Sequence, residues 1–230
     1  MRPSTLTQTD FVRQSGESAV LTIRPARVAM HTGTKWPVSK ARLRKLHRVL
    51  PRALTNLVRP AIKRREPFVI PPRYFGTPHP MTETPRYLRV ADFIRRPGPV
   101  EDTAWFRDLA EELAATGAAR HKDIVMRSRE DIHGFFDTYV IPMIDSLRRD
   151  GFDTTRADFD SVAVIDADGR LTKAGSGNHR FAICQVLDSP SFPLRVVAVH
   201  ADWYARAVLP QDDSWESLLR ALKGVERDHQ

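Results

Sequence analysis

The sequence predicts an α+β protein in which helices pack on a small mixed sheet. Two apolar, largely β-branched runs, 161–165 and 194–199, are typical of buried strands. A helical spacing of apolar residues occupies 128–150. With 230 residues, the chain is long enough for one cored domain plus an extension, or for two small domains.

Charge divides the chain unevenly. Residues 1–85 hold 16 Lys or Arg and four Asp or Glu, whereas residues 86–230 hold 20 and 24, so that the whole chain carries +8. A basic segment beside a mildly acidic domain predicts contact with an anion. We therefore expect a basic, Pro-rich amino-terminal extension, 1–85, followed by a second domain, 86–230.

The basic extension is expected to contain one amphipathic helix. Residues 1–34 are expected to be mostly irregular, with one short strand at 19–23. Apolar residues with helical spacing lie between 39 and 57, and Pro51 is expected to kink or restart this helix. The six prolines of 67–85 predict a linker, or an arm lying on the surface.

Local signals predict the elements that follow. Ser128 and Asp131 resemble a capping box, and Gly151 lies where the long helix would end. The expected elements are a short strand at 87–90 and helices at 103–116, 128–150 and 215–223.

Residues 161–187 form the sharpest feature, a strand, turn, strand, glycine-rich loop and helix. Gly175 and Gly177 permit a ligand to approach the main chain closely. The helix that follows offers free N–H groups and a positive dipole end. Arg180 could bind two phosphate oxygens, and His179 could donate or accept a proton. We predict an anion-binding loop for phosphate; an ordinary strand-to-helix turn with a solvated arginine is the alternative.

The order of hairpin, Gly-Asn-His-Arg loop, alanine-containing helix and strand resembles the ParB/sulfiredoxin-like superfamily. The residues that carry this resemblance are 168–171, 177–182 and 194–199, within about 120–200 of the chain. The resemblance implies a ParB-like nucleotide-binding domain whose cofactor is a nucleoside triphosphate, ATP or CTP. It implies cofactor contacts from the loop, namely from Gly175, Gly177, Asn178, His179 and Arg180.

Two departures from the superfamily bear on the chemistry. Sulfiredoxins have a cysteine, and partition proteins a glutamate, where this chain has Asn178. Cys184 lies later in the helix, where a small buried residue is the simpler interpretation, so repair of an oxidised cysteine is disfavoured. Without an acidic ligand in the loop, Mg²⁺ would depend on the amide oxygen of Asn178. The scattered histidines have no ligand spacing, so no structural metal is expected.

Phosphoryl transfer would require a carboxylate that holds Mg²⁺ or accepts the hydroxyl proton. Glu130 and Asp131 are the catalytic candidates, together with His179, and Asp166 and Asp168 are further carboxylates. For Glu130 and Asp131 the alternative is a charge at a helix start, and for Asp166 and Asp168 it is turn formation.

The basic run, 35–66, predicts a partner of its own. Its residues Arg42, Arg44, Lys45 and Arg48 could bind nucleic-acid phosphates or lie on an anionic membrane surface. A solvated helix packed on its own domain is the alternative. No run of 18 apolar residues occurs, so no transmembrane segment is expected. A single cysteine fits a cytoplasmic protein, or one peripheral at the inner membrane face.

These patterns lead to three hypotheses. The first is an ATP- or CTP-dependent kinase or nucleotidase that uses the Gly-Asn-His-Arg loop on an unknown acceptor. The second is a non-catalytic module that binds a nucleotide or nucleic acid, with affinity supplied by the basic amino-terminal segment. The third is a peripheral membrane accessory protein anchored by the helix at 40–57.

Overall fold

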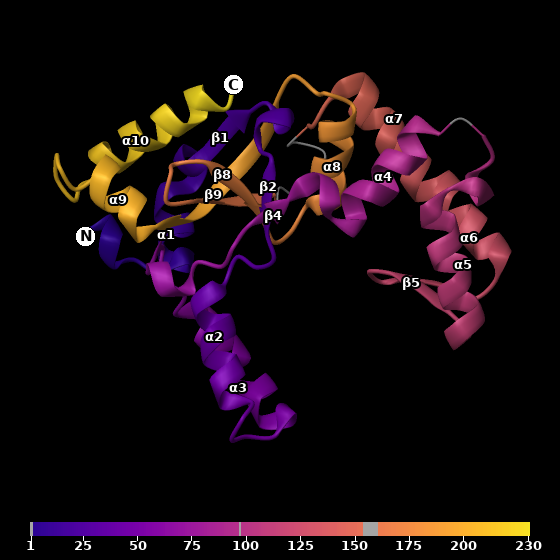
Figure 1. Ribbon diagram of the computed structural model, residues 1–230, viewed down its shortest axis with the longest axis horizontal. Helices are drawn as coiled ribbons and strands as arrows, with labels where there is room; N and C mark the ends of the chain where they lie inside the picture. The colour runs from indigo at the N-terminus through magenta and orange to yellow at the C-terminus, as the bar shows by residue number, and fades with distance from the viewer. Residues whose placement is uncertain (1, 97, 154–160) are drawn as a thin grey trace.

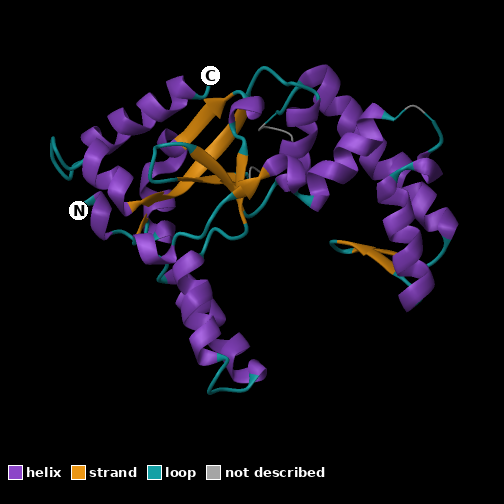
Figure 2. Cartoon of the chain, viewed as in Figure 1, coloured by secondary structure: helices purple, strands orange, loops and turns teal. Residues whose placement is uncertain are grey.

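A computed structural model describes residues 2–96, 98–153 and 161–230 (Figures 1 and 2). It confirms an α+β fold with a mixed sheet and packed helices. Within the described ranges, seven strands form one sheet and two more form a separate small hairpin. No described helix is both long and apolar enough to cross a membrane.

The large sheet has the strand order β1-β9-β7-β8-β2-β4, with β3 beside the end of β9. The pairs β9–β7, β8–β2 and β3–β9 are parallel, and the pairs β1–β9, β7–β8 and β2–β4 are antiparallel. The strands of this sheet are β1 (Val20–Ile23), β2 (Met30–Thr32), β3 (Val69–Ile70), β4 (His79–Pro80), β7 (Val162–Ile165), β8 (Leu171–Ala174) and β9 (Phe192–His200).

Part of the segment 1–85 is built into this sheet. Its four strands pair with β8, with β9 or with each other, and Val20 of β1 lies opposite Arg195 of β9. The Pro-rich residues 67–85, expected as a linker, supply two of these strands. Both are two residues long, and a 3₁₀ turn at Pro72–Tyr74 separates them, which is the limited pairing that a proline-rich stretch permits.

Helices lie at the ends and on the faces of the sheet. Helix α10 packs along β1, whereas α8 packs between α4 and α7 (Figure 1). The small hairpin of β5 (Ala119–His121) and β6 (Ile124–Met126) follows α5. The helices are α1 (Gln8–Ser15), α2 (Pro37–Leu46), α3 (Arg52–Arg64), α4 (Pro85–Arg95), α5 (Ala104–Thr116), α6 (Arg129–Phe135), α7 (Ile141–Asp150), α8 (Asn178–Val186), α9 (Ala201–Ala207) and α10 (Trp215–Asp228).

The sheet is buried on both faces. All four residues of β7 and all four of β8 are buried, which explains the continuous apolar run at 161–165. One face joins the main core with α8, and Phe181 of that helix is fully buried. The other face forms a smaller cluster that includes Val38 of α2 and Ile70 of β3.

Several local predictions are confirmed. The hydroxyl of Ser128 accepts from the Asp131 N–H while the Asp131 carboxylate accepts from the Ser128 N–H, a complete capping box. Gly151 ends α7, at φ +70°. A π-helical turn, Phe136–Val140, divides the helix expected over 128–150 into α6 and α7. The last predicted helix extends five residues further than expected, to Asp228.

The strand expected at 87–90 is wrong, because these residues lie inside α4. The Thr84 hydroxyl accepts from the Tyr87 N–H and Pro85 occupies the first turn, which are helix-start signals. Tyr87, Val90 and Ala91 are buried together on one face of the helix. A four-residue apolar window is too short to distinguish this helical spacing from a strand.

Two expectations in the amino-terminal part also need correction. Residues 8–15 form α1, whose start is capped by the Thr7 hydroxyl, rather than irregular chain. The expected strand within 19–23 is confirmed as β1. The one helix expected over 39–57 is two, α2 and α3, separated by a turn that ends at Pro51; of the kink and the restart expected at this proline, the chain shows the restart. Proline lacks an N–H and favours a helix start, so a new helix begins after it.

Candidate functional site

The loop between β8 and α8 has the backbone that the sequence predicted. Gly175 and Gly177 have φ values of +62° and +72°, in the left-handed region. A Cβ at Gly177 would lie 2.8 Å from the Ser161 Oγ, so glycine lets the loop pass against the start of β7. Gly177 occupies the cap position of α8 without a side-chain cap. The first N–H groups of α8 are therefore available to an anion.

A buried lysine holds this loop in place. Lys173 of β8 is fully buried, and its ammonium donates to the carbonyl oxygens of Ala174, at 3.2 Å, and Ser176, at 2.5 Å. It also donates to the Asn178 Oδ1, at 3.1 Å. A buried charge needs such partners to offset the loss of its hydration. The buried lysine thus holds the loop through two of its carbonyl oxygens and the Asn178 side chain.

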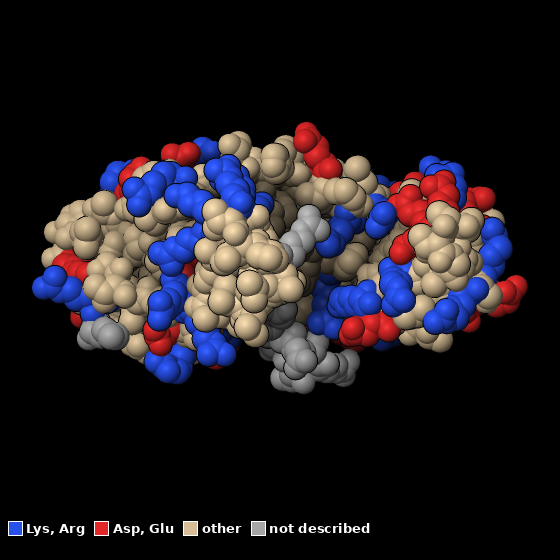
Figure 3. All heavy atoms as spheres, turned by 90° about the horizontal axis from the view of Figure 1, so that it is seen from below, with Lys and Arg blue, Asp and Glu red and all other residues tan. Residues whose placement is uncertain are grey.

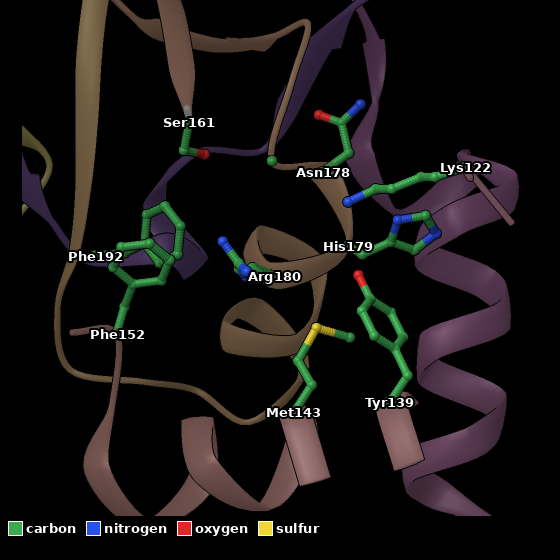
Figure 4. A pocket seen from close by; sticks show the side chains of 10 residues that line it. Lys122, Tyr139, Met143, Phe152, Ser161, Asn178, His179, Arg180 and Phe192 are labelled. Atoms are coloured by element: carbon green, nitrogen blue, oxygen red, sulfur yellow. The ribbon is translucent and has the colours of Figure 1, made fainter. Parts of the chain in front are cut away.

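A cavity of about 260 Å³ lies over the loop and the first turn of α8 (Figure 4). Two cationic side chains, Lys122 and Arg180, reach it from different elements, and Tyr139 adds a hydroxyl from the π-helical turn. Its lining residues are Lys122, Tyr139, Met143, Phe152, Ser161, Gly177, Asn178, His179, Arg180 and Phe192. The described lining therefore combines positive charge, hydroxyls and an apolar part, and it contains no carboxylate.

Lys122 is the cation that the sequence did not indicate. It lies in the turn between β5 and β6, with φ +53°, and its side chain is exposed toward the cavity. Figure 4 shows Lys122 and the Tyr139 hydroxyl on the His179 side, with Arg180 reaching between them and Phe192. Lys122 and Arg180 come from distant segments of the chain, and together they create a positive field that favours a multiply charged anion.

Ser161 adds an unsatisfied polar atom to the cavity wall. Its Oγ is buried and has no hydrogen-bond partner among the described residues. Ser161 precedes β7, opposite Gly177, so the hydroxyl lies beside the loop. A buried hydroxyl without a partner costs free energy, and a ligand oxygen could remove that cost.

His179 is electrically neutral in this setting. Its ring stacks on Trp105, with centroids 5.4 Å apart and planes 9° from parallel, and lies 5.0 Å from the His121 ring. Burial, followed by the positive charges of His121 and Arg86, lowers the pKa of His179 to about 3. At neutral pH the imidazole can donate or accept a hydrogen bond, but it adds no charge and is a weak base for proton transfer.

Asn178 does not offer a metal ligand. Its amide oxygen accepts from Lys173, and in Figure 4 its side chain points away from Arg180. Within the described ranges, no group of three or more His, Cys, Asp or Glu is arranged to hold a metal ion. The donors at this site therefore fit a phosphate, which cations and N–H groups bind, and do not fit Mg²⁺, which prefers carboxylate oxygens.

The carboxylates that the sequence suggested lie outside the cavity lining. The Asp131 carboxylate accepts from the N–H groups of Arg127 and Ser128, and so completes the capping box. Glu130 is fully exposed, and hydrogen bonds from its own N–H and from Ser128 lower its pKa. Both carboxylates therefore lie in the first turn of α6, as the alternative interpretation expected. The guanidinium of the neighbouring Arg129 lies over the Phe106 ring, 5.2 Å from its centroid.

The hairpin carboxylates act as turn formers. The Asp166 Oδ1 accepts from the N–H groups of Asp168 and Arg170, each at 2.9 Å. Asp168 lies 3.8 Å from the Arg170 guanidinium, and both side chains are exposed. Neither aspartate lines the cavity.

Cys184 is a core residue. It is fully buried in α8, and burial raises the pKa of its thiol to about 11. A thiol with this pKa is protonated at neutral pH and is a poor nucleophile. The structural interpretation of the single cysteine is therefore supported.

The four basic candidates of the amino-terminal part lie on or just after α2, away from this cavity. Arg42, Arg44, Lys45 and Arg48 are all exposed, and none lines the cavity over α8. The structure thus brings together the loop residues Gly177, Asn178, His179 and Arg180 but separates them from the basic helix. Gly175, just before this group, supports the loop without lining the cavity.

Comparison with known protein families, curated proteins and solved structures gives no match.

Proposed function

We propose that this protein binds a nucleotide in the cavity over α8. The phosphates would lie against the uncapped start of α8, between Arg180 and Lys122. The single observation that carries the proposal is that these two cations reach one cavity beside free helix N–H groups. Ser161 and Tyr139 would donate further hydrogen bonds to phosphate oxygens.

The apolar part of the cavity supports a nucleotide rather than free phosphate. Met143, Phe152 and Phe192 line the side away from Lys122 (Figure 4). A base or sugar could pack on these side chains while the charged end lies on the loop. The resemblance of the Gly-Asn-His-Arg segment to the ParB/sulfiredoxin-like superfamily is the further support for ATP or CTP as the ligand.

Catalysis and simple binding make different demands on this site. Phosphoryl transfer or hydrolysis would need a group that activates the acceptor or water. The described lining has no Asp or Glu, and the His179 pKa of about 3 makes this ring a weak base. These observations favour a nucleotide-binding module over a kinase or nucleotidase. Release of phosphate during incubation would instead support the enzyme, with an acceptor still to be found.

The first test is thermal unfolding with ATP, ADP, CTP and GTP, each with and without Mg²⁺. A ligand at a hundred times its Kd should stabilise the folded protein by about 2.7 kcal/mol. Arg180→Ala and Lys122→Ala should each weaken binding on the order of 10- to 100-fold, because each removes a charged contact. Arg227→Ala, which removes an exposed arginine on α10, should bind like the wild type.

Two results would count against nucleotide binding in this cavity. One is a melting temperature that no nucleotide changes at millimolar concentration. The other is a shift that Arg180→Ala and Lys122→Ala leave intact, since the nucleotide would then bind elsewhere. Phosphate release measured on the same samples distinguishes the binding module from the enzyme.

A further inference from the structure

A helical arm extends from the end of the sheet. It consists of α2, the turn at 47–51 and α3, and points away from the rest of the molecule in Figure 1. The Ser39 hydroxyl donates to the Ile62 carbonyl, 3.1 Å away, so the two helices run back along one another. At the base, the fully buried Glu66 carboxylate accepts from the Val38 and Ser39 N–H groups. The arm is therefore an ordered unit, fixed at its base.

The far end of the arm is apolar and exposed. Leu57 and Val49 are 78% and 76% exposed, Leu54 is 50% exposed, and Leu50 and Val58 are each 39% exposed. These five residues, the apolar tip, are five of the eight exposed large hydrophobic residues found in the described ranges. Leu54, Leu57 and Val58 lie in α3 at helical spacing, and the core clusters of the described residues include none of the five. A gathered patch of this kind marks a contact surface.

Positive charge surrounds this tip. Residues 37–65 contain ten Lys or Arg and no Asp or Glu. Figure 3 looks onto the end of the arm and shows uncharged surface bordered by Lys and Arg. Arg42, Arg44, Lys45 and Arg48 are all exposed on or just after α2. The partner of the arm must therefore accept apolar side chains and, next to them, supply negative charge.

We propose that the arm docks on the surface of an anionic phospholipid bilayer. The apolar tip enters the boundary between headgroups and acyl chains, and the flanking cations contact the lipid phosphates. The 13 residues of α3 span roughly 20 Å, so the tip can reach a bilayer while the sheet remains in water. The arm lies on the membrane and does not cross it.

Charge and apolarity together favour lipid over nucleic acid. A nucleic-acid backbone satisfies the cations but leaves Leu54, Leu57 and Val49 exposed to water. Single-strand binders place aromatic residues among their cations for stacking, and the tip has none. An anionic bilayer accommodates both parts of the arm at once.

The test uses the full chain and sedimentation with large vesicles. One set of vesicles is phosphatidylcholine alone, and the other is phosphatidylcholine mixed with phosphatidylserine. We expect binding only to the mixed vesicles. Replacing Arg42, Arg44, Lys45 and Arg48 by Gln should weaken it by roughly fivefold for each charge removed. Leu54→Ser/Leu57→Ser should weaken it by roughly tenfold or more, at every salt concentration.

The matched control removes two exposed leucines outside the arm. Leu88→Ser/Leu209→Ser changes side chains that are 54% and 47% exposed, and vesicle binding should be unchanged. A second measurement follows insertion directly. A dye sensitive to polarity, attached at Leu57→Cys, should shift to shorter wavelength with mixed vesicles; Cys184 is buried and should not react.

Three results would overturn the proposal. One is equal binding to neutral and anionic vesicles. Another is vesicle binding that the two serine substitutions at the tip leave unchanged. The third is binding to a DNA or RNA duplex, without vesicle binding, in both the wild type and the tip variant. None of these depends on nucleotide binding, which involves a separate cavity.

Discussion

Single residues at the site take their properties from the atoms that surround them in the fold. His179 and Lys173 are only six positions apart, yet one is neutral in its setting and the other forms three charge-assisted hydrogen bonds. Trp105 and His121, from other elements, surround the His179 ring. Residue identity alone would not distinguish these two roles.

The lowered pKa of His179 predicts how stability depends on pH. Its folded-state pKa is about 3, and that of His31, lowered first by burial and then by Lys173, is about 4. Both lie below the ordinary value near 6.5 for an unfolded chain. The unfolded state therefore binds protons more readily, and the stability from these two residues is complete above about pH 6.5 and is lost as the pH falls toward about 4.

The measurement is the melting temperature at steps between about pH 7 and pH 4. The melting temperature should fall in this range, and His179→Gln and His31→Gln should each make the fall shallower. The double variant should show the smallest dependence. A wild type and a His179→Gln variant with the same slope would show that this ring does not titrate as its burial requires.

At the residue scale, the sequence could indicate only what local chemistry fixes. Gly177 and Arg180 were found because a glycine-rich loop directly before a helix can bind an anion, and residues adjacent in the sequence form that arrangement. Lys122 was missed because it lies in a short hairpin with no motif of its own. Only the folded chain shows that this lysine and Arg180 face one cavity, and no local signal could have indicated it.

At the scale of elements, the β8–α8 loop owes its shape to a strand residue. The Lys173 ammonium replaces the water that would otherwise bind the loop carbonyls of Ala174 and Ser176. The loop and the helix start are therefore held before any ligand arrives. Such preorganisation lowers the free-energy cost of binding.

Lys173→Met should loosen this loop. The substitution keeps most of the side-chain volume but leaves two carbonyl oxygens and the Asn178 amide without their donor, which costs about 1–3 kcal/mol of unfolding free energy. We also expect nucleotide affinity to fall. Urea unfolding and nucleotide titration of the variant measure both effects.

The control is Lys45→Met, which removes one exposed positive charge on the arm. It should preserve both stability and nucleotide affinity. If Lys173→Met binds nucleotide as tightly as Lys45→Met does, the loop does not depend on its lysine.

Several elements with a terminal signal or a long apolar run were predicted well, but the prediction for α4 was a strand despite its Thr84 cap, and the shortest strands were not predicted. The Ser128 cap, the Gly151 end and the Asp166 turn each depend on a few adjacent residues, so the sequence contains all the information. Strands β2, β3 and β4 are two or three residues long and exist because they pair with distant strands. Their sequence has no period long enough to detect.

At the scale of the whole molecule, the amino-terminal part is structural as well as basic. Phe11, Leu21 and Ile23 are almost fully buried, and the Phe11 ring stacks on Phe68, with centroids 3.8 Å apart. The carboxylate of Glu226, in the last helix, accepts from the N–H of Thr22 in β1. The basic composition of residues 1–85 distinguishes them from the rest of the chain, but only the strand pairing shows that they complete the sheet.

Removing residues 1–24 should therefore abolish cooperative folding. The deletion takes away β1 and α1 and exposes the edge of β9 and the apolar face of α10. Near-ultraviolet circular dichroism and thermal unfolding provide the measurement, and Leu54→Ser/Leu57→Ser at the apolar tip should melt like the wild type. Cooperative melting of the shortened chain at the wild-type temperature would mean that these residues are a dispensable extension.

The three pairing partners of β9 have a consequence for how the chain acquires its structure. This strand, Phe192–His200, pairs with β1, β3 and β7, yet it follows every other described strand of the sheet in the sequence. Before β9 is present, β1 and β3 lack the strand they pair with, whereas β7, β8, β2 and β4 can already pair with one another. Because pairing β1 to β9 closes a very long loop, we expect folding to be slow and the partly folded chain to be prone to aggregation.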